Sequence, residues 1–313
     1  MNEKILFVDD EVNNLECWKR LFSDSFPTLT ASNPVDALDI MKDNRVSVIV
    51  SDYKMPQMNG IELLQRAKRL YPETVRVLIT ACNEMKIAVD AINEGEVYKF
   101  VTKPWDDREL KSVVVDSFNR HRLIQQMRAA EDSTLLTIAQ AVELKDHSTK
   151  GHCDRVARYA IELAAAAGVN RQMLRQIRVG AWLHDCGKIG IPDSILNKEG
   201  PLSLEQFEII KNHCVWGADV ARLAGLPEVV IDIILHHHER YDGKGYPFGL
   251  KGEDIPMEAR IVSIADIYDA LTTDRPYRGK YTREKALEIL EGSKGSALDA
   301  SLVDKFPALA RTF

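Results

Sequence analysis

Short β-branched segments alternate with amphipathic segments over residues 4–120, and this alternation restricts the fold more than any other feature of the sequence. Apolar runs typical of strands occupy residues 5–8, 29–31, 46–50, 75–79 and 97–101. Helical patterns such as 34–41 and 61–70 lie between them. Strands that alternate with helices form a parallel sheet covered on both faces. The sequence therefore predicts a five-stranded, doubly wound α/β domain over residues 1–120.

Charged and hydroxyl side chains stand at the carboxyl ends of the predicted strands, where sites form in such sheets. They are Asp9, Asp10, Asp52, Thr80 and Lys103. Three carboxylates at one edge repel one another unless a hard cation such as Mg²⁺ lies among them. Asp9 and Asp10 taken alone would suit helix capping. Because Asp52, Thr80 and Lys103 stand at the other strand ends, the sequence instead favours a site for Mg²⁺ and an anionic oxygen cluster.

Four motifs of this segment resemble those of a response-regulator receiver domain. They are Val8-Asp9-Asp10-Glu11, Ser51-Asp52-Tyr53-Lys54-Met55-Pro56, Leu78-Ile79-Thr80-Ala81 and Thr102-Lys103-Pro104. The resemblance implies that a cognate histidine kinase phosphorylates Asp52. It implies that Mg²⁺ binds Asp9, Asp10, Asp52 and the carbonyl group of Lys54. It also implies that Lys103 contacts the phosphoryl oxygens and that Thr80 and Phe100 form the switch pair.

Neither Gly nor Pro occurs from residue 106 to residue 150, which predicts a long helix. The sequence Glu-Asp-Ser-Thr at 131–134 is its one weak point, because Asp or Ser there could cap a new helix. We assign residues 121–143 as a helical linker. Its apolar positions do not keep a clean heptad. A homodimer seam and an ordinary packed helix therefore stand as equal alternatives.

Residues 144–313 show helical periodicity without strand alternation, which predicts an all-α domain. The expected helices cover residues 155–167, 172–185, 204–223, 228–239 and 259–271. His184 and Asp185 fall in the second of these, after an apolar run in which an unpaired carboxylate would be costly. Asp266 lies among apolar residues and has the same need for a cation. His236, His237 and His238 diverge by about 100° each on a helix, so at most two of them would easily share a site.

All eight histidines of the chain fall between His121 and His238. Imidazole and carboxylate groups together are ligands of borderline transition metals. His152 taken alone would suit a histidine of the core. The crowding of these residue types nevertheless predicts a metal centre, with candidate ligands His152, His184, Asp185, His213, His237, His238 and Asp266.

The second domain resembles the HD-GYP family, the HD-domain phosphohydrolases that cleave cyclic di-GMP. The motifs are Gly151-His152-x-x-Arg155-Val156, the stretch from His184-Asp185 through Lys188 to Asp193, His237-His238-Glu239, Gly245-Tyr246-Pro247 and Asp266-x-x-Asp269-Ala270-Leu271. The resemblance implies one metal ion held by His152, His184, Asp185 and Asp266. Asp185 would bridge to a second ion completed by His213, His237 and His238. Lys188 would contact the scissile phosphate, and Arg275 and Arg278 would hold substrate phosphates. The ligands suit two divalent transition-metal ions and do not distinguish Fe, Mn, Zn and Ni.

Two positions depart from the family pattern. Ser148 stands where some members carry a glutamate for a third metal ion, with His147 and Asp146 as the nearest substitutes. A serine hydroxyl is a poor ligand, so we expect two metal ions and linear pGpG as the main product. Leu298-Asp299-Ala300 replaces the usual Phe-Asp-Pro, a change that concerns packing.

Composition limits the remaining function classes. The chain has 41 Lys and Arg against 47 Asp and Glu, a net charge of -6, which argues against a nucleic-acid polymer as partner. The scattered cysteines lack a Cys-x-x-Cys pair and suit a reduced cytoplasm. No apolar run approaches the roughly 18 residues that would insert in a membrane. The alternatives to a cyclic di-GMP phosphodiesterase are a phosphodiesterase for cyclic GMP-AMP, a catalytically weak HD-domain adaptor and a mononuclear HD hydrolase of other nucleotides.

Overall fold

The computed structural model describes residues 3–81, 85–93, 96–146, 151–274 and 279–310. The chain divides into two compact units, Met1–Ala130 and Glu131–Phe313. The boundary between these units falls inside the predicted linker. No helix of the described ranges is long and apolar enough to cross a membrane.

The first unit contains a parallel sheet of five strands in the order β2-β1-β3-β4-β5. The strands are β1 (Lys4–Val8), β2 (Thr28–Ala31), β3 (Val46–Asp52), β4 (Val75–Ala81) and β5 (Lys99–Lys103). They alternate with α1 (Val12–Phe22), α2 (Pro34–Asp43), α3 (Gly60–Leu70), α4 (Met85–Asn93) and the start of α5 (Asp107–Glu143). The predicted doubly wound class is confirmed, and β5 begins two residues later than predicted.

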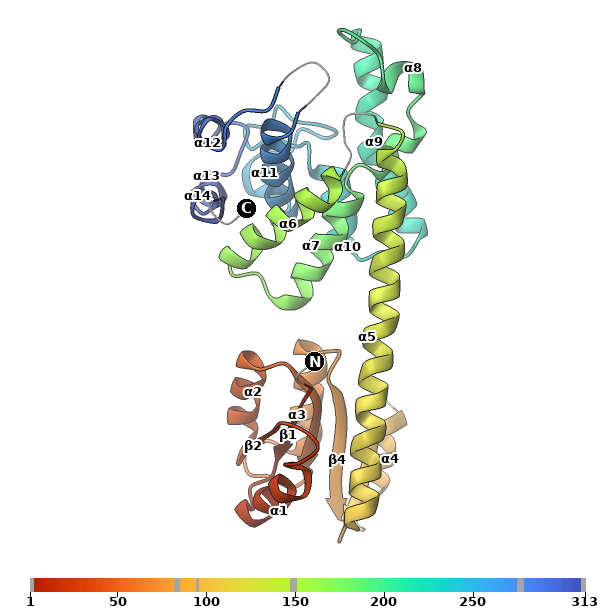
Figure 1. The fold of residues 1–313 in the computed structure, drawn as a ribbon, viewed down its shortest axis with the longest axis vertical. Helices are drawn as coiled ribbons and strands as arrows, with labels where there is room; N and C mark the ends of the chain where they lie inside the picture. Colours follow the sequence, from red (N-terminus) through yellow and green to blue (C-terminus); the bar gives the residue numbers. More distant parts are fainter. Residues whose placement is uncertain (1–2, 82–84, 94–95, 147–150, 275–278, 311–313) are drawn as a thin grey trace. The chain divides into compact units, whose positions relative to one another are not determined.

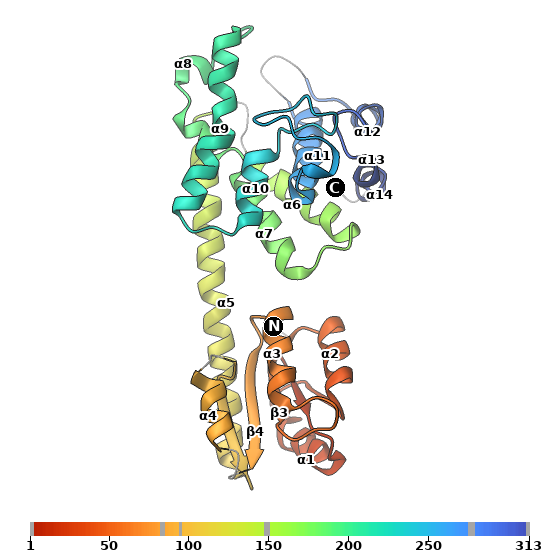
Figure 2. The same ribbon diagram turned by 180° about the vertical axis from the view of Figure 1, so that it is seen from behind.

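Both faces of this sheet are buried, as the continuous apolar runs require. Successive residues of a strand point to opposite faces. Ile5 and Phe7 therefore contact a core shared with α1 and α5. Leu6 and Val8 contact a second core, shared with α2, α3 and α4. Figures 1 and 2 show the sheet and its helices from opposite sides. Since the faces are covered, the ends of the strands remain as the place for a site.

Helix α5 is continuous over 37 residues and does not break at residues 131–134. Glu131 and Asp132 serve as helix side chains, 2.9 and 2.5 Å from a guanidinium nitrogen of Arg175. The expectation that the helix continues beyond Glu143 was wrong, because the amides of Lys145 and Asp146 bond carbonyls only three residues back, in a turn. The start of α5 packs in the first unit, and its later residues pack against the core of the second.

The second unit is helical, as predicted. It contains α6 (His152–Ala166), α7 (Arg171–Leu183), α8 (Asp193–Leu196), α9 (Leu204–Leu223), α10 (Glu228–His236), α11 (Met257–Thr272), α12 (Arg283–Gly292), α13 (Ala300–Val303) and α14 (Phe306–Leu309). Two short 3-10 helices, η2 (Cys186–Gly190) and η3 (Gly252–Asp254), join the longer ones. Helices α6, α7, α10 and α11 pack around one apolar core that includes Val156, Ile177, Ile234 and Ile261 (Figure 2).

Two helices end earlier than predicted, and the difference moves the site residues. α7 stops at Leu183 rather than residue 185, and α10 stops at His236 rather than residue 239. Glycines in the following turns press against other backbone: a Cβ on Gly187 would lie 2.0 Å from the carbonyl oxygen of His213. A Cβ on Gly245 would lie 2.3 Å from the backbone nitrogen of Arg240. The candidate ligands after α7 and α10 therefore stand at helix ends. Two of the three successive histidines, His237 and His238, join one group of candidate ligands, as predicted, whereas His236 lies 3.9 Å from Asp232.

Candidate metal centre and phosphoacceptor site

Four imidazole rings of the second unit point the same ring nitrogen, Nε2, toward one another. The Nε2 atoms of His152 and His184 are 3.3 Å apart, and those of His213 and His237 are 3.5 Å apart. The Nδ1 atoms of His184, His213 and His237 lie 2.8, 2.7 and 3.0 Å from backbone carbonyl oxygens. A carbonyl only accepts, so each of these Nδ1 atoms donates its proton, and in His213 and His237, whose pKa values burial lowers, Nε2 carries a lone pair. The facing lone pairs of His213 and His237 suit a cation between them.

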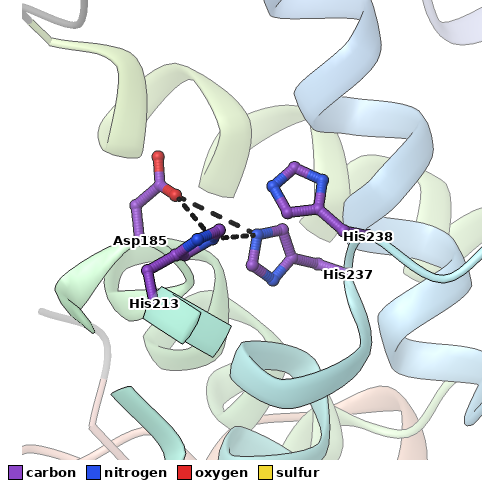
Figure 3. Close-up of side chains that lie close together, drawn as sticks. All are labelled: Asp185, His213, His237 and His238. Carbon is purple, nitrogen blue, oxygen red and sulfur yellow. Dashed lines mark hydrogen bonds and ion pairs between the residues drawn. The ribbon is translucent and has the colours of Figure 1, made fainter. Parts of the chain in front are cut away.

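The candidate ligands form two groups, in each of which the ligand atoms lie within 4.8 Å of one another. One group is Asp185, His213, His237 and His238, and the other is His152, His184 and Asp266. Asp185 is close to both groups, because its Oδ1 lies 3.4 Å from His213 and its Oδ2 lies 3.4 Å from His184. Figure 3 shows Asp185 facing His213 and His237, with His238 beside them. The structure thus brings all seven candidates together.

Burial sets the protonation of this cluster. It lowers the pKa of His213, and it lowers the pKa of His238 to about 4. These rings are therefore neutral at pH 7, which is the form that binds metal. Burial alone would raise the pKa of Asp185, but Lys188 and His184 hold the pKa of this carboxyl well below its usual range. Neutral imidazoles around an ionised carboxylate are a donor set that fits divalent transition-metal ions.

Asp269 orients one of these rings, a role that the sequence analysis did not assign. Its carboxylate lies 2.7 Å from Nδ1 of His152 and accepts a bond of 2.6 Å from Nε of Arg155. Burial opposes the charged imidazolium, but the carboxylates of Asp266 and Asp269 outweigh it and raise the pKa of His152 to about 9. A carboxylate behind a ligating histidine fixes the ring and increases its basicity. The i, i+3 spacing of two acids in an apolar helix was the available signal.

Lys188 lies between two carboxylates at the edge of the metal cluster. Its ammonium is 2.8 Å from Asp185 and 2.9 Å from Asp146. Burial favours the neutral amine, but these two charges outweigh it and raise the pKa of Lys188 above its usual value. Asp146, considered above as a substitute ligand for a third metal ion, is thus already engaged by a cation of the chain itself.

Two further acids hold the loops around the site and were missed by the sequence analysis. Glu143 accepts bonds from the backbone amides of Gly151 and Cys153, at 2.8 and 2.5 Å, where α6 begins. Glu239 is 3% exposed and accepts bonds of 2.7 to 3.1 Å from three successive amides, those of residues 248–250. Backbone amides have no sequence signature, so neither role could have been read from residue types.

The cysteines next to candidate ligands are suited to packing. Cys153 and Cys214 are buried, and Cys186 is partly buried. Burial raises the pKa of the Cys186 thiol to about 12, and it raises the pKa of the other two thiols as well. A thiol that is not ionised at pH 7 is a weak nucleophile.

Four candidate positions, His147, Ser148, Arg275 and Arg278, lie outside the described residues.

The carboxyl ends of the strands in the first unit bring a second set of candidates together. Asp9, Asp10 and Asp52 offer oxygens within 4.8 Å of one another. Lys103, the last residue of β5, places its ammonium 2.7 Å from Asp52 and 3.7 Å from Asp9. Burial raises the pKa of both Asp9 and Asp52 against the pull of Lys103. Crowded, partly buried carboxylates of this kind suit Mg²⁺.

The remaining receiver candidates surround this cluster. Thr80 is buried in β4, whereas Phe100 of β5 is partly buried and packs against the core beneath α4. Lys54 follows β3, and its side chain is exposed. A Cβ on Gly60 would lie 2.1 Å from the carbonyl oxygen of Asp52, so this position of α3 has no room for a side chain. The close approach holds the loop after Asp52 against the sheet.

Comparisons with known proteins identify the domain family of each unit. A model of the response regulator receiver domain matches residues 5–115, and a model of the HD domain matches residues 137–302. The cyclic di-GMP phosphodiesterase response regulator RpfG of Xanthomonas campestris is 35% identical over 96% of this chain and 86% of its own. A cyclic di-GMP phosphodiesterase of Thermotoga maritima is 28% identical over 98% of this chain and 90% of its own. A 3'3'-cGAMP-specific phosphodiesterase of Vibrio cholerae is 36% identical over 60% of this chain and 36% of its own.

Proposed function

Because this chain belongs to the response regulators that join a receiver domain to an HD-GYP domain, we propose that it hydrolyses cyclic di-GMP at a binuclear metal centre controlled by phosphorylation of Asp52. Residues 1–120 are the proposed receiver, 121–143 the linker and 144–313 the hydrolase. The observation that carries the proposal is the convergence of the Nε2 atoms of His184, His213 and His237 within 4.0 Å of Asp185, with the Nε2 of His152 beside that of His184. A protein that only docks partners would not need to keep this full set of ligands.

Each group of ligands would hold one divalent ion. His152, His184 and Asp266 would bind the first, and His213, His237 and His238 the second. Asp185 would bridge them, since its two oxygens face different groups. When bound, the ions supply Lewis acidity and lower the pKa of a water molecule. The chain itself contributes fixed ring orientation, through the carbonyls and Asp269 behind the imidazoles.

Lys188 would act on the phosphodiester directly. Its ammonium borders Asp185, so a phosphate bound at the cluster lies within its reach. A positive charge there stabilises negative charge that develops on the phosphoryl oxygens. Asp146 would hold the ammonium in place from the other side. We also assign Arg275 and Arg278 to substrate phosphates.

Linear pGpG is the proposed main product. Asp146 pairs with Lys188, and Ser148 supplies no carboxylate, so the chain has two metal ions rather than three. Fewer positive charges then face the new terminal phosphate of pGpG, and the second cleavage to GMP is slow. The bound ions are of the Fe, Mn, Zn or Ni type.

The receiver would control this reaction. A cognate histidine kinase transfers a phosphoryl group to Asp52 beside Mg²⁺, which Asp9, Asp10 and the Lys54 carbonyl help to hold. Lys103 contacts the phosphoryl oxygens, and Thr80 and Phe100 act as the switch pair that responds to phosphorylation. Helix α5 would transmit the change to the hydrolase domain.

Val115, Leu123 and Met127 of α5 are exposed apolar side chains at i, i+8 and i+12. This row favours a homodimer of the chain through α5. We also propose that the protein acts in the cytoplasm.

One experiment separates this proposal from its alternatives. Metal-loaded protein is incubated with cyclic di-GMP and with 3'3'-cGAMP, and the products are separated by chromatography. We expect pGpG from cyclic di-GMP as the faster reaction. Faster hydrolysis of 3'3'-cGAMP would favour the cyclic GMP-AMP alternative, and turnover of neither would favour an adaptor.

A further inference from the structure

Phe207, Lys211 and Tyr246 form a wall of two aromatic rings and one ammonium beside the metal cluster, which we call the base wall. The rings of Phe207 and Tyr246 meet edge to face, with centroids 6.1 Å apart. The ammonium of Lys211 lies 4.9 Å from the centroid of the first ring and 5.7 Å from that of the second. Phe207 and Lys211 are four residues apart on α9 and therefore share one face of this helix.

The base wall adjoins the candidate ligands through Tyr246. The Tyr246 ring packs against His238, with centroids 4.8 Å apart, and lies 6.5 Å from the ring of His213. Phe207 packs against the same Tyr246 ring and is 41% exposed. In a nucleotide, one ribose separates the phosphate from the base. A base attached to a phosphate at the metal cluster is therefore within reach of the base wall.

The chemistry of the base wall matches a nucleobase. Aromatic side chains bind bases by stacking, which does not depend on the identity of the base. Lys211 adds selectivity, because an ammonium only donates hydrogen bonds. Guanine offers the adjacent acceptors O6 and N7, whereas adenine offers N7 beside an amino donor. Glu208, the partner of Lys211 at 2.6 Å, is 69% exposed, so their pair is weak and two ammonium protons remain to donate.

We propose that Phe207 stacks on one base of a bound cyclic dinucleotide and that Lys211 selects guanine at this position. The inference rests on the proposed phosphodiesterase activity and extends it to specificity. A guanine fixed at the base wall decides which of the two phosphodiester bonds faces the metal cluster. In symmetric cyclic di-GMP this choice has no visible result. In 3'3'-cGAMP it determines whether the linear product is pGpA or pApG.

The test compares the wild type with Lys211→Met, which keeps the apolar stem on Phe207 and removes the charge. From 3'3'-cGAMP we expect one linear isomer in about tenfold excess in the wild type, and a ratio near one in Lys211→Met. Phe207→Leu should raise KM for both dinucleotides and leave the ratio unchanged. Lys285→Met is the matched control, because Lys285, like Lys211, pairs with an exposed acid three residues away on its helix.

Binding of mononucleotides tests the same inference without turnover. Calorimetric titration of the full chain should show about tenfold tighter binding of GMP than of AMP, and this preference should disappear in Lys211→Met. Equal isomers or equal mononucleotide affinities in the wild type would overturn the role of Lys211, as would a ratio that Lys211→Met leaves unchanged. A protein that binds GMP selectively but cleaves no dinucleotide would instead contradict the proposed function.

Discussion

The ammonium of Lys188 lies 2.9 Å from the carboxylate of Asp146, and this pair connects the residues after α5 to the metal cluster. The same ammonium is 2.8 Å from Asp185. Lys188 is therefore held from two sides, by one candidate ligand and by one residue that is not a ligand. If Asp146 only positions Lys188, its loss should affect the rate of hydrolysis and leave the metal content intact.

Asp146→Asn should lower kcat about 10- to 100-fold, because it removes the charge that holds Lys188 and keeps the shape of the side chain. Bound metal should stay at two equivalents per chain, as measured by elemental analysis. Asp193→Asn serves as the control, since Asp193 is an exposed acid that pairs with Lys145 at 3.5 Å. Three equivalents in the wild type, with one lost in Asp146→Asn, would show that Asp146 is a ligand after all.

Asp185→Ala should abolish hydrolysis and remove most of the bound metal. Asp185 lies between the two ligand groups, so its loss takes one donor from both. Of the two carboxylates described above beside the ammonium of Lys188, the substitution leaves Asp146. Circular dichroism should still show a helical protein, because the apolar core of α6, α7, α10 and α11 is unchanged. Turnover near that of the wild type would end the binuclear proposal.

Much of the fold could be predicted because its signals are periodic. Strand and helix periods, together with punctuation by Gly and Pro, located the five strands of the receiver and most helices of the second unit. The ends of α7 and α10 could not be located, since they depend on close backbone approaches of two glycines: Gly187 meets His213 and Gly217 of α9, and Gly245 folds back onto Glu239 and Arg240. Close approach of this kind has no local pattern. As a result, His184 with Asp185 and His237 with His238 stand at helix ends instead of on helix faces.

The candidate ligands could be predicted for a different reason: a charged side chain inside an apolar segment must have a partner. This reasoning led to Asp185 and Asp266. It did not reach Glu143 and Glu239, whose partners are backbone amides. It also considered Asp146 as a metal ligand, because sequence spacing did not reveal that Lys188 reaches the same place from η2.

Asp52 should accept a phosphoryl group from a small-molecule donor such as acetyl phosphate when Mg²⁺ is present. Phosphorylation should change the rate of cyclic di-GMP hydrolysis by severalfold, since α5 packs in the first unit and also against the core of the second. Gel separation on a phosphate-binding matrix measures the modification. Asp52→Ala should remain unmodified, with a rate insensitive to the donor. An unchanged rate in the fully phosphorylated wild type would show that the receiver controls something else.

Asp299 precedes α13, in the segment where Leu298-Asp299-Ala300 departs from the family pattern. Its carboxylate accepts bonds of 2.8 and 2.7 Å from the amide and hydroxyl of Ser301 and one of 2.5 Å from Arg260. Burial alone would raise the pKa of this carboxyl, but these bonds outweigh burial and hold the pKa below its usual value. The folded protein thus favours the ionised form of Asp299, and this residue stabilises the fold in a pH-dependent way.

The sign of this dependence follows from the lowered pKa. The stabilisation is complete above the pKa of the unfolded chain, about 4, and is lost as pH falls through the folded pKa. Asp299→Asn keeps a capping oxygen and removes the charge. We expect it to lower the free energy of unfolding by about 1–3 kcal/mol at pH 7 and by progressively less below pH about 4. Urea unfolding of the full chain measures the difference. Asp304→Asn, which removes one exposed partner of Lys294, should change the free energy of unfolding by less than about 1 kcal/mol at pH 7 and at pH about 3. A deficit of Asp299→Asn that stays constant down to pH about 3 would assign its effect to shape rather than charge.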